Sequence, residues 1–330
     1  MVPRESPDRN LALELVRVTE AAALAAARWQ GRGDKESGDQ AAVDAMRMML
    51  STVDMDGIVV IGEGEKDEAP MLYNGERIGT GHAPPVDIAV DPVEGTTLLA
   101  EGRPGAIAVM AMAPRGTMFD PGPCVYMEKL VVDRETAGVV DLDAPIAENL
   151  QAIAKAKGKE VRDVTVVMLD RDRHADLVRG IREAGARLQL ITHGDVAAAL
   201  RAVWEERPDV DLLIGIGGTP EGVIAACAVK CLDGQMLGRL WPRSDEERVA
   251  AQDEGYDLDA ILTADDLVRS DDVFFVCTGI TGGGLVEGVH FDRRGAATES
   301  VVMRSKSGTI RFVRASHRLG KLREYAAIDY

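Results

Sequence analysis

The fold of this chain is decided in residues 86–97, which read Val86-Asp87-Ile88-Ala89-Val90-Asp91-Pro92-Val93-Glu94-Gly95-Thr96-Thr97. The first five residues are mainly apolar and predict a strand, which we expect to stop at Pro92 because proline cannot donate to a strand ladder. A glycine and two threonines then lead into an apolar segment that predicts a helix start, where free N–H groups favour an anion. Asp91 and Glu94 add carboxylate oxygens for a hard cation. The stretch therefore suits metal-assisted phosphoryl chemistry.

The same short motif is equally compatible with an acidic surface turn, because Asp, Pro and Gly are common turn residues. A second junction of strand and acid favours the functional interpretation. Residues 57–61 predict a short buried strand. Gly62 and Gly64, on either side of Glu63, let the backbone turn sharply and direct the carboxylate. Ligands of open α/β sheets gather beyond strand ends of this kind.

The composition limits the possible partners. With 330 residues, of which 46% are apolar, the chain is long enough to bury a large core in two lobes. Its formal net charge is −17 and its sequence pI is about 4.8. Such a negative surface repels a phosphate backbone and an anionic bilayer, so we expect no nucleic acid and no membrane as partner. A phosphorylated small molecule is compatible with this charge, because cations bound at a site invert the local field.

The cysteines and the apolar runs predict a cytoplasmic protein. None of the four cysteines forms a C-x-x-C pair. Cys227 and Cys231 lie four residues apart in an apolar helical run, which favours buried free thiols over zinc ligands. We find no signal peptide and no apolar run long enough to span a bilayer.

Two amphipathic helices are predicted near the N-terminus. Asp8 is a candidate cap for the first, which we expect to end near residue 29, and Asp39 lies at the expected start of the second. The pattern alone favours a plain cap at Asp39, and a metal ligand is the alternative. Residues 106–145 read as β-rich, with candidate strands at 106–113, 127–132 and 138–142.

A repeating strand–loop–helix pattern occupies residues 163–231 and predicts a largely parallel sheet. Its strands are expected at 163–169, 187–191 and 211–216, and a closing hairpin at 301–304 and 309–313. Polar residues again follow the strand ends: Arg171, Arg173, His193, Asp195 and Glu221. Two arginines separated by one residue point to the same side of an extended chain, so Arg171 and Arg173 are a plausible fork for a phosphate.

The candidate acids form a set of oxygen ligands: Asp39, Glu63, Asp91, Glu94 and Glu221. Because no His or Cys cluster accompanies them, the expected metal is Mg²⁺ or Mn²⁺ rather than zinc. Thr96, beside two of these acids, can position a water or help to deprotonate it. The predicted chemistry is the hydrolysis of a phosphate monoester. No Walker A lysine motif suggests a kinase or an ATPase.

Several strings now resemble a known family. Asp91-Pro92-Val93-Glu94-Gly95-Thr96 is similar to the core motif of the lithium-sensitive, metal-dependent sugar and inositol phosphatases. Longer strings are similar to the bacterial class II fructose-1,6-bisphosphatases of the GlpX type: Gly31-Arg32-Gly33-Asp34-Lys35, Ile61-Gly62-Glu63-Gly64-Glu65, Asp67-Glu68-Ala69-Pro70-Met71-Leu72-Tyr73 and Gly215-Ile216-Gly217-Gly218-Thr219-Pro220-Glu221-Gly222. The resemblance runs from about residue 11 to the closing hairpin.

The resemblance implies a layered α/β/α/β/α sugar-phosphatase sandwich with two lobes, and a homo-oligomer, either a dimer or a tetramer. Residues 1–145 would form the N-terminal lobe with most metal ligands. Residues 146–330 would form the C-terminal lobe with Glu221 and the sugar-phosphate contacts.

The resemblance also implies residue roles. Asp39 and Glu63 match the ligands of one metal, whereas Asp91, Glu94 and Glu221 match those of the other; this overrules the plain cap at Asp39. Thr96 matches the catalytic threonine. The implied substrate contacts are Glu94, Gly95, Thr96, Tyr126, Arg171, Arg173, His193, Gly194, Asp195 and Gly218. His193 stands where the family more often has an acid, and Thr97 where an arginine is common.

The function that this resemblance implies is hydrolysis of the 1-phosphate of fructose 1,6-bisphosphate in gluconeogenesis, with inhibition by lithium. Two alternatives stay open at this point. The same chemistry can act on sedoheptulose 1,7-bisphosphate or an inositol phosphate. A non-catalytic sugar-phosphate sensor would need neither Thr96 nor the full set of acids, and both are present.

Overall fold

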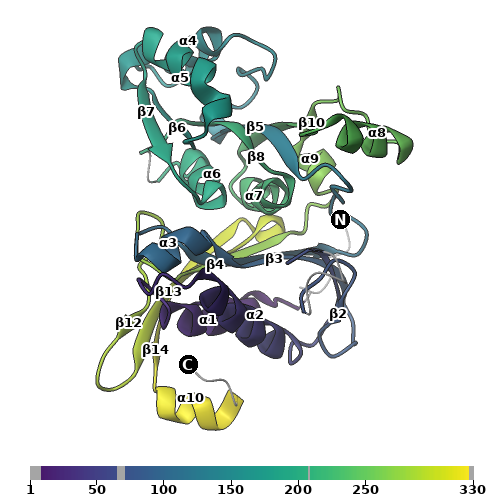
Figure 1. Ribbon diagram of the computed structural model, residues 1–330, viewed down its shortest axis with the longest axis vertical. Helices are drawn as coiled ribbons and strands as arrows, with labels where there is room; N and C mark the ends of the chain where they lie inside the picture. Colours follow the sequence, from purple (N-terminus) through teal and green to yellow (C-terminus); the bar gives the residue numbers. More distant parts are fainter. Residues whose placement is uncertain (1–8, 65–70, 207–208, 327–330) are drawn as a thin grey trace, which may run out of the picture.

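The structure is a computed structural model that describes residues 9–64, 71–206 and 209–326. Figure 1 shows five stacked layers, in which two β-sheets alternate with three layers of helices. Helices α4 (Ile146–Ala156) and α5 (Ala175–Glu183) form one outer layer. Helices α6 (Asp195–Val203) and α7 (Thr219–Cys231) lie between the sheets, and α1 (Ala12–Ala27) and α2 (Lys35–Leu50) form the other outer layer. The expected α/β/α/β/α sandwich is confirmed.

The first sheet has eight strands and is mainly antiparallel. Its strands are β1 (Asp56–Ile61), β2 (Arg77–Ile78), β3 (Pro85–Glu94), β4 (Ile107–Pro114), β11 (Phe274–Gly279), β12 (His290–Phe291), β13 (Ala296–Arg304) and β14 (Thr309–His317). Only β1 and β3 run parallel among the described pairs. The expected hairpin near the C-terminus is confirmed as β13 and β14.

The second sheet has six strands in the order β10-β9-β5-β8-β6-β7. Its strands are β5 (Tyr126–Val132), β6 (Thr165–Leu169), β7 (Arg187–Ile191), β8 (Leu212–Gly218), β9 (Gln235–Leu240) and β10 (Leu262–Thr263). The strand–loop–helix repeat does give three parallel neighbours, β7, β6 and β8. The expectation of a largely parallel sheet is wrong for the other half, because β5 inserts antiparallel to β8 and β9.

Three apolar clusters hold the layers together. One packs α1 and α2 against the first sheet, a second fills the space between the sheets around α6 and α7, and a third packs α4 and α5 on the outer face of the second sheet. Strand β4 has an unbroken apolar sequence because both of its faces are covered. Ala108 and Met110 face α1, whereas Val109 and Ala111 face the central layer. A strand covered on both faces has no use for polar alternation.

The remaining helices are α3 (Thr96–Glu101), α8 (Asp245–Asp253), α9 (Ala264–Leu267) and α10 (Leu319–Ala326). None of the helices in the described ranges is long and apolar enough to cross a bilayer. Each sheet takes strands from both sides of residue 145, since β11–β14 join the first sheet and β5 joins the second. The division into two lobes at that residue stays a prediction.

Two helix starts differ from the sequence expectation. Helix α2 begins at Lys35, and the carboxylate of Asp34 caps it by accepting a hydrogen bond from the Ser37 N–H at 3.0 Å. Asp39 therefore lies inside the helix, and the plain cap favoured by the pattern is wrong. Helix α1 begins at Ala12, whose N–H donates to Asn10 Oδ1 at 3.0 Å. Asp8 lies outside the described residues.

The candidate strand at residues 138–142 is wrong, because this segment forms turns and an irregular loop. Val140 and Leu142 are 7% and 8% exposed and pack into the cluster beneath α4. Their alternation therefore reflects burial of a loop rather than pairing in a sheet. Gly138 has a φ of +79°, which favours glycine, and its N–H donates to Gln235 Oε1 at 2.7 Å.

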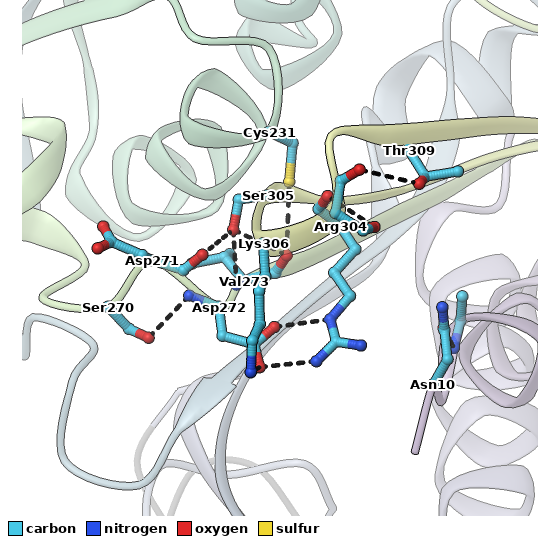
Figure 2. A network of polar contacts seen from close by, with 12 residues as sticks. Asn10, Cys231, Ser270, Asp271, Asp272, Val273, Arg304, Ser305, Lys306 and Thr309 are labelled. Atoms are coloured by element: carbon cyan, nitrogen blue, oxygen red, sulfur yellow. Dashed lines mark hydrogen bonds and ion pairs between the residues drawn. The ribbon is translucent and has the colours of Figure 1, made fainter. Parts of the chain in front are cut away.

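The turn of the β13–β14 hairpin is fixed to the start of β11 by a polar network (Figure 2). Arg304 donates from Nε and Nη2 to the two carboxylate oxygens of Asp272, both at 2.7 Å. The Ser305 hydroxyl donates to Asp271 O at 2.7 Å and accepts from the Val273 N–H at 2.8 Å. Paired arginine–carboxylate bonds have a defined geometry, so they align β13 with β11 at the end of the ladder.

A buried acid lies between α1 and the hairpin. Glu20 is 9% exposed, accepts a hydrogen bond from the Thr298 hydroxyl at 3.2 Å, and lies 4.0 Å from His317 Nε2. Burial raises the pKa of Glu20 to about 7, although Thr298 and the charge of Arg17 oppose the shift. Burial also lowers the pKa of His317, so the imidazole is a poor cationic partner.

We expect Glu20→Gln to stabilise the protein at pH 8 and to change its stability little at pH 4.5. The pKa of Glu20 is higher in the folded state than in the unfolded state. The protein therefore loses stability as the pH rises from 4.5 to about 7. The gain at pH 8 is roughly 1–3 kcal/mol, from about 1.4 kcal/mol per pKa unit. Thermal unfolding at both pH values measures it, with the half-exposed Glu14→Gln as control. A gain of equal size at both pH values would contradict this interpretation.

Candidate active site

A cavity of about 630 Å³ lies where the ends of β1 and β3 face the ends of β6 and β8. The structure brings every candidate site residue of the sequence analysis to its wall: Asp39, Glu63, Asp91, Glu94, Gly95, Thr96, Tyr126, Arg171, Arg173, His193, Gly194, Asp195, Gly218 and Glu221. Residues from both sheets and from the central helix layer thus share one site. Of the strings that carry the resemblance, residues 65–70 lie outside the described part of the chain.

Strand β3 continues through Pro92, so the expectation that it stops there is wrong. Its pairing with β4 shifts register between Asp91 and Glu94, which pair with Val109 and Ile107. The extra residue forms a bulge, where a strand tolerates a proline that cannot donate. The bulge is closed locally, because the Val93 N–H donates to Asp91 Oδ1 at 3.0 Å. It places Asp91 and Glu94 together on the cavity wall.

Glu94 connects the first sheet to the central layer. Its side chain is 5% exposed, and its Oε1 accepts a hydrogen bond from the Val196 N–H at 3.3 Å. Val196 belongs to the first turn of α6, where backbone N–H groups have no partner within the helix. Thr96 follows directly after Gly95, whose φ of +92° starts α3. The expected helix start after the motif is confirmed.

Glu63 and Asp39 approach from β1 and α2. Gly62 is required before Glu63, because a Cβ at this position would lie 1.9 Å from Leu72 O. Burial and the charge of Asp39 raise the pKa of Glu63 to about 7, and burial raises the pKa of Asp39. The two side chains therefore share a poorly solvated part of the wall.

Two glycines at the end of β8 make room for two acids. A Cβ on Gly218 would lie 1.7 Å from Glu221 Oε2, and a Cβ on Gly217 would lie 2.2 Å from Asp195 Oδ2. Asp195 is the first residue of α6 rather than its cap, which is Gly194. It pairs with Lys129, whose Nζ lies 2.7 Å from Asp195 Oδ2 and whose side chain is 3% exposed. Lys129 was not among the predicted site residues, because a single lysine in a strand belongs to no motif.

The acids raise one another's pKa. Burial is the largest cause for Asp91, followed by the charges of Glu94 and Glu63, and the pKa of Asp91 lies well above its usual value. Burial and the charges of Asp195 and Glu221 raise the pKa of Glu94 to about 8. Burial also raises the pKa of Glu221, against the charge of Lys129. This pole of the cavity disfavours uncompensated negative charge and so favours bound cations.

The donor chemistry fits hard cations. The five candidate ligands offer only carboxylate oxygens, which Mg²⁺ and Mn²⁺ prefer. Within residues 9–64, 71–206 and 209–326, no three His, Cys, Asp or Glu side chains form a ready metal-binding group. The residue types therefore match the metals, whereas the division of ligands between two metals stays a prediction.

A basic pole lies on another part of the wall. The guanidinium carbons of Arg173 and Arg243 lie 5.1 Å and 5.4 Å from the centre of the Tyr126 ring. Arg171 donates from Nη2 to Thr192 O at 2.8 Å, and Arg173 donates from Nη2 to Ile216 O at 2.7 Å. The largest charge effects on the pKa of Asp91 and Glu94 come from other acids, and those on Glu221 from Asp195 and Lys129. The cavity thus has separate acidic and basic poles.

Arg243 also lines the cavity and was not among the predicted site residues. This residue follows β9, directly before the Ser244 cap of α8, and its Nε donates to Glu247 Oε1 at 2.7 Å. No pattern in the sequence indicates that residue 243 lies over the ring of residue 126. His193 also lines the cavity, where burial lowers its pKa and the charges of Arg171 and Lys35 add to the shift. Both effects favour the neutral form of the His193 imidazole.

Oxygen donors and guanidinium groups on the wall of one cavity, inside a five-layer α/β sandwich, are the arrangement of a metal-dependent phosphatase. Comparison with known proteins specifies the family. The family model described as bacterial fructose-1,6-bisphosphatase, glpX-encoded, matches residues 9–317. The chain belongs to this family.

The chain is 45% identical to fructose-1,6-bisphosphatase 1 class 2 of Escherichia coli K12, over 95% of this chain and 96% of that protein. The same identity and coverage hold for the class 2 fructose-1,6-bisphosphatases of Escherichia coli O6:H1 and Shigella flexneri. The sequence-based assignment to the GlpX type is confirmed.

We expect Gly218→Ala to reduce turnover about 100-fold or more without a large loss of thermal stability. The added methyl would overlap Glu221 Oε2 and displace that side chain from the acidic pole, while the backbone (φ −63°, ψ 139°) accepts alanine. Activity and thermal unfolding measure the two effects. Gly320→Ala in α10, with no neighbour within 4 Å, is the matched control. Normal turnover in Gly218→Ala would show that the position of Glu221 is unimportant.

Proposed function

We propose that this protein hydrolyses the 1-phosphate of fructose 1,6-bisphosphate to give fructose 6-phosphate and phosphate, in gluconeogenesis. The observation that carries the proposal is the single cavity with an acidic and a basic pole. A molecule with a phosphate at each end can place one at each pole. The relatives named as class 2 fructose-1,6-bisphosphatases, which match over nearly their whole length, support this substrate.

In this proposal Asp39 and Glu63 hold one cation, and Asp91, Glu94 and Glu221 hold another. The cations are Mg²⁺ or Mn²⁺, in keeping with an all-carboxylate ligand set. When bound, they supply charge neutralisation at the phosphoryl oxygens and make water more acidic. The raised pKa values of the same acids support their role as cation ligands, because such a cluster is unfavourable as free anions.

Thr96 orients the attacking water and helps to remove its proton. It lines the cavity beside Glu94 and is the first residue of α3, so its backbone is fixed by Gly95 before it and the helix after it. Fixed positions of nucleophile and phosphate lower the entropic part of the barrier. The full set of acids together with Thr96 supports an enzyme rather than a sugar-phosphate sensor.

The distal phosphate binds at the basic pole. Arg171, Arg173 and Arg243 supply the guanidinium groups, and Tyr126 supplies the ring over which two of them lie. His193, Gly194, Asp195 and Gly218 also line the cavity and would contact the sugar. The same two poles would accept sedoheptulose 1,7-bisphosphate, so the geometry supports a bisphosphate more strongly than an inositol monophosphate.

We expect phosphate release from fructose 1,6-bisphosphate to require Mg²⁺ or Mn²⁺ and to stop with chelator. Asp91→Asn should lower kcat by about 1,000-fold or more while thermal unfolding changes little, because one charged ligand is lost from the acidic pole.

Millimolar lithium should inhibit by competing for a carboxylate site. Sedoheptulose 1,7-bisphosphate and an inositol phosphate are the comparison substrates. Undiminished release in chelator would sink the metal-dependent mechanism.

We expect Arg243→Met to raise KM for the bisphosphate about tenfold and to leave the hydrolysis of a sugar monophosphate nearly unchanged. The reason is that a charge-assisted contact to the distal phosphate, of about 1.5–3 kcal/mol, is lost only when that phosphate is present. Steady-state kinetics on both substrates measure the split. Arg248→Met, at an exposed position of helix α8, which follows Arg243, is the control. Equal effects on both substrates would remove Arg243 from the distal site.

We further propose a cytoplasmic homo-oligomer, a dimer or a tetramer. The four cysteines are free and buried, which suits a reducing compartment. Strand β14 is nine residues long and pairs, among the described strands, with β13 alone. Its Phe312 is 47% exposed. Long edge strands are usually covered in native proteins, and a second copy of the chain would supply such a cover.

A further inference from the structure

The imidazole of His174 joins the ends of two strands that border the active site. His174 lies just before α5 and is 2% exposed. Its Nδ1 lies 2.8 Å from Leu169 O, at the end of β6, and its Nε2 lies 2.8 Å from the Ile216 nitrogen in β8. The residue belongs to none of the site roles assigned above, although its chain neighbours Arg171 and Arg173 do.

The partners of the ring fix its tautomer. A carbonyl oxygen only accepts, so Nδ1 carries the hydrogen that donates to Leu169 O. A backbone N–H only donates, so Nε2 of the neutral ring accepts from Ile216. Burial lowers the pKa of His174, and the charges of Arg173 and Arg171 oppose protonation, although the bond to Leu169 raises it. Lys129 of β5 and Asp195 of α6 line the same small gap beside the ring.

The His174 ring bridges β6 and β8 beyond the last residues that pair directly between these strands. Strands β6 and β8 are in parallel register at Val166 with Leu212 and at Val167 with Leu213. Beyond these pairs the imidazole of His174 connects the two strands by two hydrogen bonds, one to each strand. Gly215 lets it approach, because a Cβ there would lie 3.0 Å from the ring carbon Cε1. His174 therefore acts as a wedge that holds the strand ends apart while keeping their polar groups bonded.

The wedge is connected to both poles of the cavity. Both backbone polar groups of Ile216 are hydrogen-bonded. Its N–H donates to His174 Nε2, and its carbonyl oxygen accepts from Arg173 Nη2 at 2.7 Å. The next residues are Gly217 and Gly218, which lie against Asp195 and Glu221. A shift of Ile216 would therefore move the arginine pole relative to the acidic pole.

We propose that His174 is a positioning residue that sets the separation between the basic pole and the acidic pole by holding the ends of β6 and β8. It touches no substrate in this role. It acts through Arg173 on one side and through Gly217 and Gly218 on the other, so that a molecule with two phosphates meets both poles at once. The kinetic consequence rests on the proposed function, whereas the state of the ring does not.

The experiment compares two variants of the full-length protein. His174→Phe keeps a ring of similar size and removes both hydrogen bonds, and His174→Gln can restore the acceptor for Ile216. We expect His174→Phe to raise KM for fructose 1,6-bisphosphate about tenfold, with kcat changed less than about threefold and the hydrolysis of a sugar monophosphate little affected. His174→Gln should recover part of the loss. His290→Phe, at an exposed position in β12, is the matched control.

A second measurement keeps the proposal testable if His174→Phe does not fold. In ¹⁵N-histidine-labelled wild-type protein, NMR should show one ring in the neutral Nδ1–H form at pH 7 and at pH 6, absent in His174→Gln. If the ring of His174 is protonated or in the Nε2–H form at pH 7, the proposal is wrong. It is also wrong if a folded His174→Phe variant has an unchanged KM for fructose 1,6-bisphosphate. Wild-type protein inactive on fructose 1,6-bisphosphate would refute the proposed function, and the NMR result would still decide the state of His174.

Discussion

Repulsion between buried carboxylates is the constraint on which the rest of the structure depends. Burial and neighbouring charge together raise the pKa of Glu63, Asp91, Glu94 and Glu221, and these acids come from two layers of the sandwich. The first sheet supplies three, and the central helix layer supplies the fourth. Backbone N–H groups donate to Asp91 and Glu94. The buried Lys129, which pairs with Asp195, opposes the rise in the pKa of Glu221 through its charge. The site therefore depends on the order of the layers, because this order brings strand ends and helix starts to one cavity.

The sequence indicated most of this site, because its residues follow strand ends in recognisable strings. Asp91, Glu94 and Thr96 stand within one motif, and Glu63 and Glu221 each stand beside glycines whose small size the structure explains. The strand–loop–helix pattern likewise predicted β6, β7 and β8 with their helices. The five-layer order came from resemblance, since local patterns do not say which sheet a strand joins.

The failures have physical causes that a sequence conceals. Strand β5 inserts between β8 and β9 from a distant part of the chain, so a local repeat could not show that half the sheet is antiparallel. Pro92 remains in a strand because a bulge removes the need for its N–H. Val140 and Leu142 imitate a strand by alternating, yet they pack a loop. Arg243, Lys129 and His174 act through neighbours far away in sequence, and no spacing rule links such partners.

The position of β11 between β4 and β13 bears on how the protein is made. During synthesis, strands β1 to β4 leave the ribosome long before residues 274–317, which complete the same sheet. Until β11 is made, the backbone edge of β4 that pairs with it has no partner. The first sheet then covers α6 and α7 only in part. Pairing over such sequence distances is slow and exposes strand edges to other chains. The interleaved order therefore leaves a strand edge exposed until nearly all of the chain has been translated.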